Sequence, residues 1–269
     1  MKQKRITMLK SRFILPFTLV LGCTLPSICQ AKISAYLGYV NVSTLPKGSG
    51  QMSTMRRQAI QETASSLGAR GALAYRSVQI NHILNKQSNL LDSIFSFNRL
   101  LLPHNILPPV LETSDNSMSE NSNTSIRGSS KTYRLIQRAK FVTTPPTWRD
   151  YLIMSYKKPD LPAHILLPQD KTEATLWNQS LTEGWKQGIN QANEMFEVNL
   201  NRLKRDIDGM ILYQRLVALR MVSAPSVVTK DLGITGNANE ININDYIKLI
   251  TGRAELQPDS RQWRAISTH

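Results

Sequence analysis

The residues able to do covalent chemistry are few, and the cysteines lie near the beginning of the chain. The sequence has two cysteines, Cys23 and Cys29, and every residue after Cys29 is of another type. The body of the chain therefore lacks a disulfide framework, thiolate metal ligands and a cysteine nucleophile. The four histidines form no HExxH motif and no close pair, and they stand at His82, His104, His164 and His269.

Motifs for nucleophilic and nucleotide chemistry are also missing. There is no GxSxG nucleophile elbow, no GxxxxGK[ST] phosphate loop and no dinucleotide-binding fingerprint. The Asn-rich stretch from Asn237 fails as a calcium loop, because it has no glycine at the sixth position and Lys248 at the twelfth. We expect a protein that works by binding and is not an enzyme, with no cofactor and no metal site.

The chemistry that remains is processing of the N-terminal segment. Five basic residues within residues 2–12 precede the apolar run from Phe13 to Gly22, which Pro16 interrupts. A membrane-spanning helix needs about 20 apolar residues, so this run is too short. Residues 1–22 are predicted to be a secretory signal, starting at Met1 or at Met8.

Two cleavage sites are compatible with this signal. The string VLGC, Val20 to Cys23, resembles a bacterial lipoprotein box, in which the cysteine carries a diacylglycerol and an N-acyl chain. Thr24 in place of an aspartate fits sorting to the outer membrane, facing the periplasm. The alternative is cleavage after Ala31, at the small-x-small string CQA, which yields a soluble periplasmic protein. We favour lipidation of Cys23.

The mature chain is basic under either cleavage. The whole sequence has 33 Lys+Arg and 19 Asp+Glu, a net charge of +14. Residues 1–22 contain five basic residues and no acidic one, which leaves 28 basic against 19 acidic residues, a net of +9. Anionic lipid head groups or an acidic protein face are the expected partners. Direct nucleic-acid binding is not expected, because no basic segment carries interleaved aromatic residues and no zinc-finger spacing occurs.

The first half of the mature chain is predicted to be a tether followed by helix. Residues 23–50 contain Pro46, Gly48 and Gly50 and are expected to form a flexible tether. From Gln51 apolar residues recur at helical spacing, and a second helical piece is expected at about 90–102. Gly68 and Gly71 indicate either a helix break or a close contact with another backbone. Residues 112–130, rich in Ser and Asn, are predicted to be a mobile loop.

Residues 131–142 alternate between apolar and basic side chains, which predicts a half-buried strand. Its outer face carries Arg134, Arg138 and Lys140, a candidate docking face for an acidic partner. In the following TTPPTWRDYL, Thr147 and Asp150 have capping-box spacing. Trp148, Arg149 and Tyr151 are candidate partner-binding residues because such residues dominate interface hot spots, although burial in the core is the more frequent role of such aromatic rings.

The longest periodic segment is 170–222. Apolar residues recur from Trp177 to Ile211, Asp170 and Glu173 form an N-terminal cap signature, and Pro225 follows the end. Such a helix either breaks at Gly184, Gly188 or Gly209 or spans an elongated molecule. The C-terminal part has short β-like runs separated by Gly and Asn. The expected fold class is α+β, rich in helix, with a long amphipathic helix and short β segments near 131–142 and in the C-terminal part.

Several long strings resemble one protein family. They are SLGARGALAYRSVQIN, NHILNKQSNLLDSIFSFNRLLLPHNILPPVL, FVTTPPTWRDYL, GWKQGINQANEMFEVNLNRLKRDIDGM and LGITGNANEININD. In this order they resemble the DotC family, lipoproteins of type IVB (Dot/Icm) secretion systems and of related plasmid conjugation systems. The resemblance runs from about Gln51 to Trp263 and implies one periplasmic domain over residues 51–265.

The resemblance also implies partners. Members of the DotC family act with a second lipoprotein, DotD, to place DotH in the outer membrane, within a multi-subunit ring complex. It implies no catalytic residues, and the residue that it carries over is the lipid acceptor, Cys23. The cargo, protein effectors or DNA, is not determined by the sequence.

Overall fold

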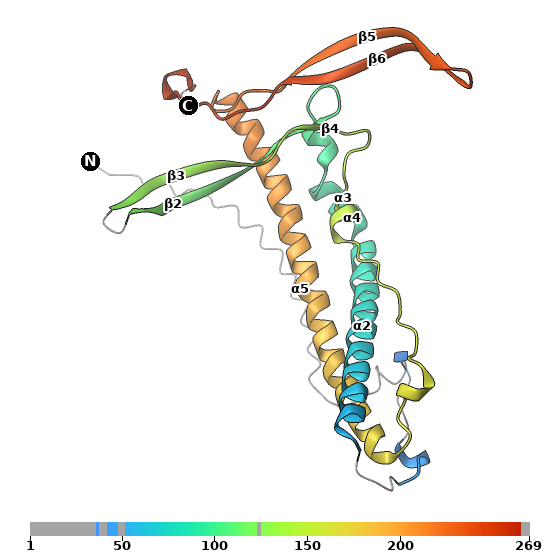
Figure 1. Cartoon of the computed structure of the whole chain (residues 1–269). Coiled ribbons are helices and arrows are strands. Elements are labelled where there is room, and N and C mark those ends of the chain that lie inside the picture. The colour runs from blue at the N-terminus through green and yellow to red at the C-terminus, as the bar shows by residue number, and fades with distance from the viewer. Residues whose placement is uncertain (1–35, 38–41, 48–51, 123–124, 265–269) are drawn as a thin grey trace.

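The computed structural model shows an elongated molecule built on two long antiparallel helices (Figure 1). It describes residues 36–37, 42–47, 52–122 and 125–264. Helix α2 spans Thr54–Lys86 and α5 spans Lys171–Ala218. Between them lie α3 (Ser88–Ile94), the 3-10 helix η2 (Phe97–Leu100), α4 (Trp148–Leu152) and η3 (His164–Leu166). The α+β class with a long helix near 170–222 is confirmed.

Helix α5 is continuous across the glycines where a break was considered. Its 48 residues give a length of about 72 Å at 1.5 Å per residue. The Asp170 carboxylate accepts the Glu173 backbone N–H at 2.8 Å, as the cap signature predicted. The second helical piece expected at about 90–102 is present as two shorter pieces, α3 and η2.

The glycines allow the two helix backbones to touch. A Cβ placed on Gly184 would overlap the Ser65 carbonyl, and one on Gly188 would overlap the Ala69 carbonyl. On the facing helix, a Cβ on Gly68 would overlap the Leu181 carbonyl. The small residues of α2 and α5 are therefore contact points, and the alternative of a helix break at these positions is wrong.

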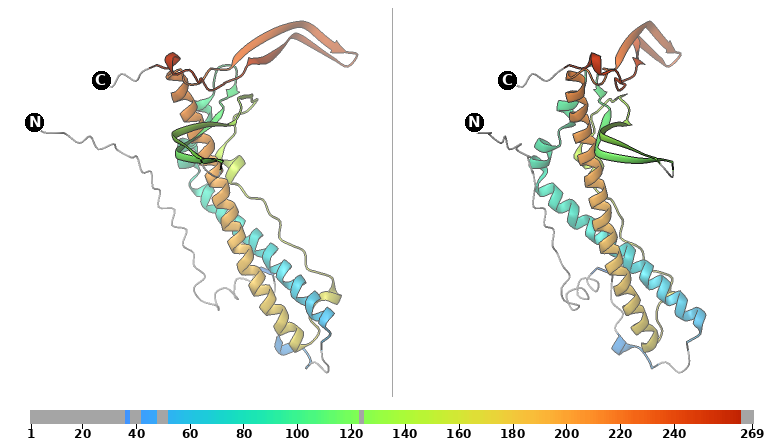
Figure 2. Two further views of the ribbon diagram at one scale, coloured as in Figure 1. Left: turned by 60° about the vertical axis from the view of Figure 1, so that its left-hand side comes forward. Right: turned by 90° about the vertical axis from the view of Figure 1, so that its left-hand side faces the viewer.

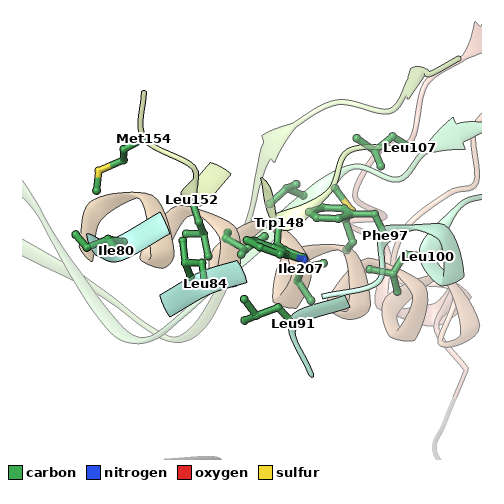
Figure 3. Close-up of a cluster of buried hydrophobic side chains, with 13 residues drawn as sticks. Ile80, Leu84, Leu91, Phe97, Leu100, Leu107, Trp148, Leu152, Met154 and Ile207 are labelled. Carbon is green, nitrogen blue, oxygen red and sulfur yellow. The ribbon is translucent and has the colours of Figure 1, made fainter. Parts of the chain in front are cut away.

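Two clusters of buried side chains fill the space along the helix pair. The proximal cluster, near the start of α5, consists of Leu37, Ile60, Ala64, Leu67, Ala72, Trp177, Leu181 and Trp185. The distal cluster packs α3, η2 and α4 onto the helices (Figure 3), and its largest side chains are Trp148 and Phe97. A third cluster, of Leu111, Tyr213, Leu216, Val222 and Ala254, joins the hairpins to the end of α5.

Part of the expected tether is docked on the helix pair. Tyr36 makes edge contacts with Tyr75 and Trp185, at centroid distances of 5.4 and 6.1 Å. Leu37 is buried against Gly71, and η1 (Val42–Thr44) follows. Within the predicted tether, residues 23–50, the described residues thus contact the helix pair, and the Lys171 N–H donates to the Pro46 carbonyl at 3.1 Å. The predicted signal 1–22, Cys23, Cys29 and Ala31 lie outside the described residues.

Two hairpin arms leave the region around the C-terminal end of α5 (Figures 1 and 2). The first arm pairs β2 (Val110–Ser122) with β3 (Ser125–Gln137), and the second pairs β5 (Ser226–Asn237) with β6 (Glu240–Gly252). Both are antiparallel and two-stranded. A short pair, β1 (Ile106–Leu107) with β4 (Lys140–Phe141), lies beside the first arm's base.

The prediction of a mobile loop at 112–130 is wrong, because most of these residues form the first arm. The arm is anchored where Val110 and Leu111 cross α5 at Gly209, a position at which any Cβ would overlap them. Pairing then continues outward through polar residues, including a hydrogen bond of 2.7 Å between Ser117 and Thr132. The sequence pattern did not predict β2 or the outer half of β3, because polar residues predominate there and show no apolar alternation.

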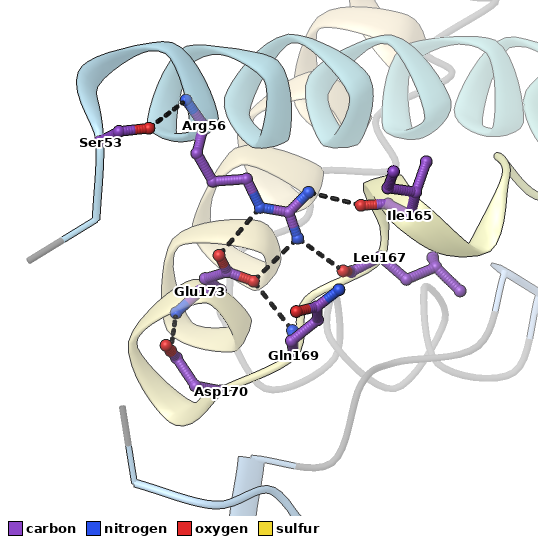
Figure 4. Close-up of polar contacts among 7 residues, drawn as sticks. All are labelled: Ser53, Arg56, Ile165, Leu167, Gln169, Asp170 and Glu173. Carbon is purple, nitrogen blue, oxygen red and sulfur yellow. Dashed lines mark hydrogen bonds and ion pairs between the residues drawn. The ribbon is translucent and has the colours of Figure 1, made fainter. Parts of the chain in front are cut away.

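An ion pair closes the proximal end of the helix pair (Figure 4). The Arg56 guanidinium on α2 donates to both Glu173 carboxylate oxygens at 2.9 Å, and it also donates to the carbonyls of Ile165 and Leu167. The Gln169 N–H donates to Glu173 at 2.9 Å. These bonds lower the pKa of Glu173, with the Arg56 hydrogen bond as the largest cause.

Replacing Gly184 by alanine is expected to lower the free energy of unfolding by about 1–3 kcal/mol. The added methyl group would displace the Ser65 backbone, which cannot move aside as a flexible side chain can. This cost exceeds the gain of up to about 1 kcal/mol in helix propensity. Urea unfolding followed by circular dichroism measures it. Gly128→Ala, where no atom lies within 4 Å of the new Cβ, is the control and should change stability little.

Glu173→Gln is expected to lower the free energy of unfolding at pH 7 by about 2–3 kcal/mol, because it removes charge-assisted hydrogen bonds from a buried site. The folded-state pKa of Glu173 lies below its usual value. Its contribution is therefore present above the unfolded pKa of about 4.3 and is lost as pH falls through the lower folded pKa. The difference between Glu173→Gln and the native chain should shrink in acid. The exposed Glu183→Gln is the control, and a difference independent of pH would contradict this role.

Candidate assembly interface

Trp148 is a core residue rather than an exposed partner anchor. Its side chain is 1% exposed, within the distal cluster, and its indole N–H donates to Asp92 at 2.6 Å. Arg149 lies over the Trp148 ring at 4.3 Å and also donates to Asp92, at 2.8 Å. The capping box predicted for Thr147 and Asp150 is present at the start of α4. Together these contacts fix α4 against α3.

Tyr151 takes part in a buried polar network instead of facing a partner. Its hydroxyl donates to Asp206 of α5 at 3.0 Å, and its ring stacks on Phe97 at 5.7 Å. Burial raises the pKa of Tyr151, and the neighbouring Asp206 raises it further. Asp206 is almost fully buried and also accepts from Arg205, at 2.7 Å, and from Gln137 of β3. The network ties α4 and the first arm to α5.

The predicted basic face is exposed. Arg134 lies on β3, Lys140 on β4, and Arg138 between them, all with exposed side chains. Their neighbours Tyr133 and Leu135 pack against the third cluster, as the alternation predicted. Beyond them the alternation fails, because Ile136 packs against the distal cluster and Phe141 is exposed on β4. Arg134 lies opposite Glu112 in the strand register. These three cations remain accessible to an acidic partner, whereas Trp148 and Tyr151 do not.

The second arm exposes apolar side chains that sequence analysis did not single out. Ile234 pairs with Ile243, and Gly236 pairs with Ile241, two residues farther along each strand. These isoleucines therefore share one face, and they are 72%, 71% and 69% exposed. Nearer the base, Val228 lies opposite Leu249. The alternation of isoleucine with polar residues in EININDYIKLI predicts a strand with one apolar face. In the structure no second sheet covers that face within the described residues.

The first arm carries a smaller apolar surface at its far end. Met118 and Ile126 are 79% and 74% exposed. The intervening strand residues are Ser, Thr and charged side chains, including the Asp115–Lys131 ion pair at 3.7 Å. Apolar side chains on an otherwise polar surface mark contact sites when they gather on one element. Both arms therefore offer surface suited to assembly.

Comparison with protein-family models decides the family. Residues 54–265 match the model T4SS_TraI, described as "Type IV secretory system, conjugal DNA-protein transfer". The match covers both long helices and both arms. The chain belongs to the T4SS_TraI family. A search of curated proteins gives no match. The chain is therefore a type IV secretion or conjugation protein.

In this T4SS_TraI chain the titratable groups are scattered. His82, His104 and His164 are exposed on α2, on the turn before β1 and on η3. No group of three or more metal-ligating side chains occurs within the described ranges, and no helix there is long and apolar enough to cross a membrane. Asp92 and Asp259 have lowered pKa values because Arg149 and Arg261 donate to them. These arginine contacts are typical of structural ion pairs.

A basic cavity lies where the chain returns to the end of α5. It has a volume of about 650 Å³ and is lined by Arg220, Arg261, Gln262, Trp263 and Arg264. The Arg264 N–H donates to the Leu219 carbonyl at 2.8 Å, and Val222 pairs with Leu256. These bonds fix the base of the second arm to α5.

Trp148→Ala is expected to lower the free energy of unfolding by about 3–5 kcal/mol, the usual cost of truncating a buried tryptophan. Arg149→Ala should cost far less, because its ion pair with Asp92 and its cation–π contact are exposed. Thermal and urea unfolding of the two variants measures both values. A fully stable Trp148→Ala protein that failed only in partner binding would contradict the core role.

Proposed function

We propose that this chain is a DotC-type outer-membrane lipoprotein of a type IVB secretion system. In this proposal acylated Cys23 anchors the chain, and the folded body faces the periplasm. With a DotD-like lipoprotein it places a DotH-like component in the outer membrane, so that effectors or DNA can cross. The chain works by binding, without a catalytic residue or a cofactor.

One observation carries the proposal: the strings that resemble the DotC family fall in the same body that matches the T4SS_TraI model, residues 54–265. The family match gives secretion or conjugation, and the resemblance gives the particular lipoprotein. The VLGC string ahead of this body supplies the lipid acceptor. Three acyl chains, at about 0.8 kcal/mol per buried CH₂ group, are sufficient for stable membrane retention.

The architecture supports an assembly role. The molecule is a rod of two helices with two arms, and some of its exposed apolar side chains lie on those arms, among them Met118 on the first and Ile234, Ile241 and Ile243 on the second. The basic face of Arg134, Arg138 and Lys140 supplies an exposed surface for an acidic partner. Binding surfaces of this kind are what a component of a multi-subunit complex requires.

Two alternatives make different demands. A soluble periplasmic factor cleaved after Ala31 would have the same body and no acyl chains. A periplasmic hydrolase without a recognisable motif would hold carboxylates with displaced pKa values in a pocket. Glu173, Asp92 and Asp259 have lowered pKa values, and each is paired with an arginine, which favours a structural role. Burial raises the pKa of Asp208 on α5, and Lys204 opposes that shift.

The test is the intact mass of the N-terminal peptide from membrane-extracted protein. A peptide beginning at Cys23 with diacylglycerol and N-acyl groups is expected. Cys23→Ser should then move the chain from the outer membrane to the soluble periplasm and reduce the amount of DotH-like component in the outer membrane. Cys29→Ser is the matched control and should change neither. An unmodified peptide beginning at Lys32 would overturn the lipoprotein assignment and leave the soluble alternative.

A further inference from the structure

The second arm lacks a layer to pack against within the described part of the chain. β5 and β6 form a sheet of two strands, so the outer edge of each has no neighbouring strand there. Ile234, Ile241 and Ile243 are each about 70% exposed. A two-stranded hairpin by itself is at best marginally stable in water, and free edges readily pair with other chains. The arm therefore has the properties of a strand pair that is completed by another sheet.

Charge indicates which surface completes it. Residues 226–252 contain three acidic residues and two basic ones, in a chain whose overall charge is +14. The acidic residues are Asp231, Glu240 and Asp245. Residues 125–140, which include β3, contain five basic residues and no acidic one: Arg127, Lys131, Arg134, Arg138 and Lys140. Over both strands, residues 110–140 contain these five basic residues and three acidic ones, Glu112, Asp115 and Glu120, a net charge of +2, against −1 for residues 226–252. The two arms therefore carry small net charges of opposite sign.

The two arms of one chain point away from each other. In Figure 1 the first arm extends to the left of the helix pair and the second arm to the right, with their tips far apart, although in the right-hand view of Figure 2 both arms lie to the right of α5. The base of the second arm is fixed to α5 by the Val222–Leu256 pairing and by the Gln257 N–H, which donates to Met221. The strand β3 that the second arm meets must then belong to another molecule.

We propose that the β5–β6 arm of one copy binds along β3 of a second copy. The arm's isoleucine face packs toward Ile126 and Met118, and its carboxylates lie near Arg127 and Arg134. Each copy offers both surfaces, so the contact is head-to-tail and can continue from one copy to the next. This inference rests on the assembly role proposed above. It assigns the second arm of a neighbouring copy as the acidic partner of the basic face of β3.

A membrane is a less suitable occupant of the arm. Its tip carries Asn237, Asn239 and Glu240, and Asp245 follows on β6. Burying these groups in hydrocarbon would leave amides and carboxylates without water. Beside β3 the same groups meet cations and free backbone N–H groups.

Disulfide crosslinking in the full-length chain tests the contact, in a Cys29→Ser background in which Cys23 carries the acyl chains. Two forms with different tags are co-expressed, one with Ile243→Cys on the second arm and the other with Ser130→Cys, which lies on the same face of β3 as Ile126. Both positions are exposed. We expect a disulfide-linked dimer that contains both tags. Ser66→Cys, exposed on α2, replaces Ser130→Cys in the control pair and should give no dimer.

Other crosslinking results would overturn the proposal. Dimers of Ile243→Cys with itself would indicate an arm-to-arm contact. Crosslinks to a different subunit alone would assign the arm to that subunit. Protection of Ile243→Cys from a water-soluble maleimide by anionic vesicles would indicate insertion into lipid. Absence of any dimer in chains whose N-terminal peptide is acylated would exclude the contact while leaving the lipoprotein assignment intact.

Charge reversal provides a second test. It distinguishes a role of these arginines in the contact from a role in the stability of β3 alone. Arg127→Glu with Arg134→Glu should reduce the mixed-tag dimer about tenfold, because charge pairs at interfaces are strongly coupled. A partner form carrying Asp231→Lys and Glu240→Lys should restore it. Reversal of Glu183 and Lys186 on α5 is the control and should have no effect. Failure of the complementary pair to restore the dimer, with both forms folded, would contradict the assigned surfaces.

Discussion

The structure depends on close contact between the backbones of α2 and α5. Gly68, Gly184 and Gly188 stand where any side chain would overlap the carbonyl of the facing helix. At this distance the tryptophans of the proximal cluster fill the flanks of the contact rather than separating the helices. The glycine contacts fix how far α2 is shifted along α5. The Arg56–Glu173 ion pair fixes the same alignment at the proximal end.

The rest of the molecule is arranged along this rod. Tyr36 and Leu37 pack on it within the proximal cluster, against Trp185 and Gly71. The arms leave from the distal region, where Gly209 lets β2 cross α5 and Asp206 receives bonds from α4, β3 and α5 itself.

The sequence was most informative where side chains are buried on one face. Helical spacing predicted α5 from its cap to its end, and alternation predicted the inner part of β3 with exposed Arg134 and partly buried Leu135. It was least informative for the outer part of the first arm, where Ser, Asn and Thr form strands with both faces exposed to solvent. Trp148 shows a further limit, since a tryptophan in a turn-rich string has the same composition whether it binds a partner or fills a core.

The sequence by itself determined the helix periods, the capping residues, the absence of cysteine chemistry from the body, and the strings that resemble a secretion family. These properties depend on neighbours within a few positions or on residue type alone. Only the tertiary structure decided that the glycines are contact points, that residues 36–47 in part dock, and that the second arm's isoleucines remain exposed. Each of these features depends on contacts between segments that are far apart in the sequence. The spacing of neighbouring residues does not specify such contacts.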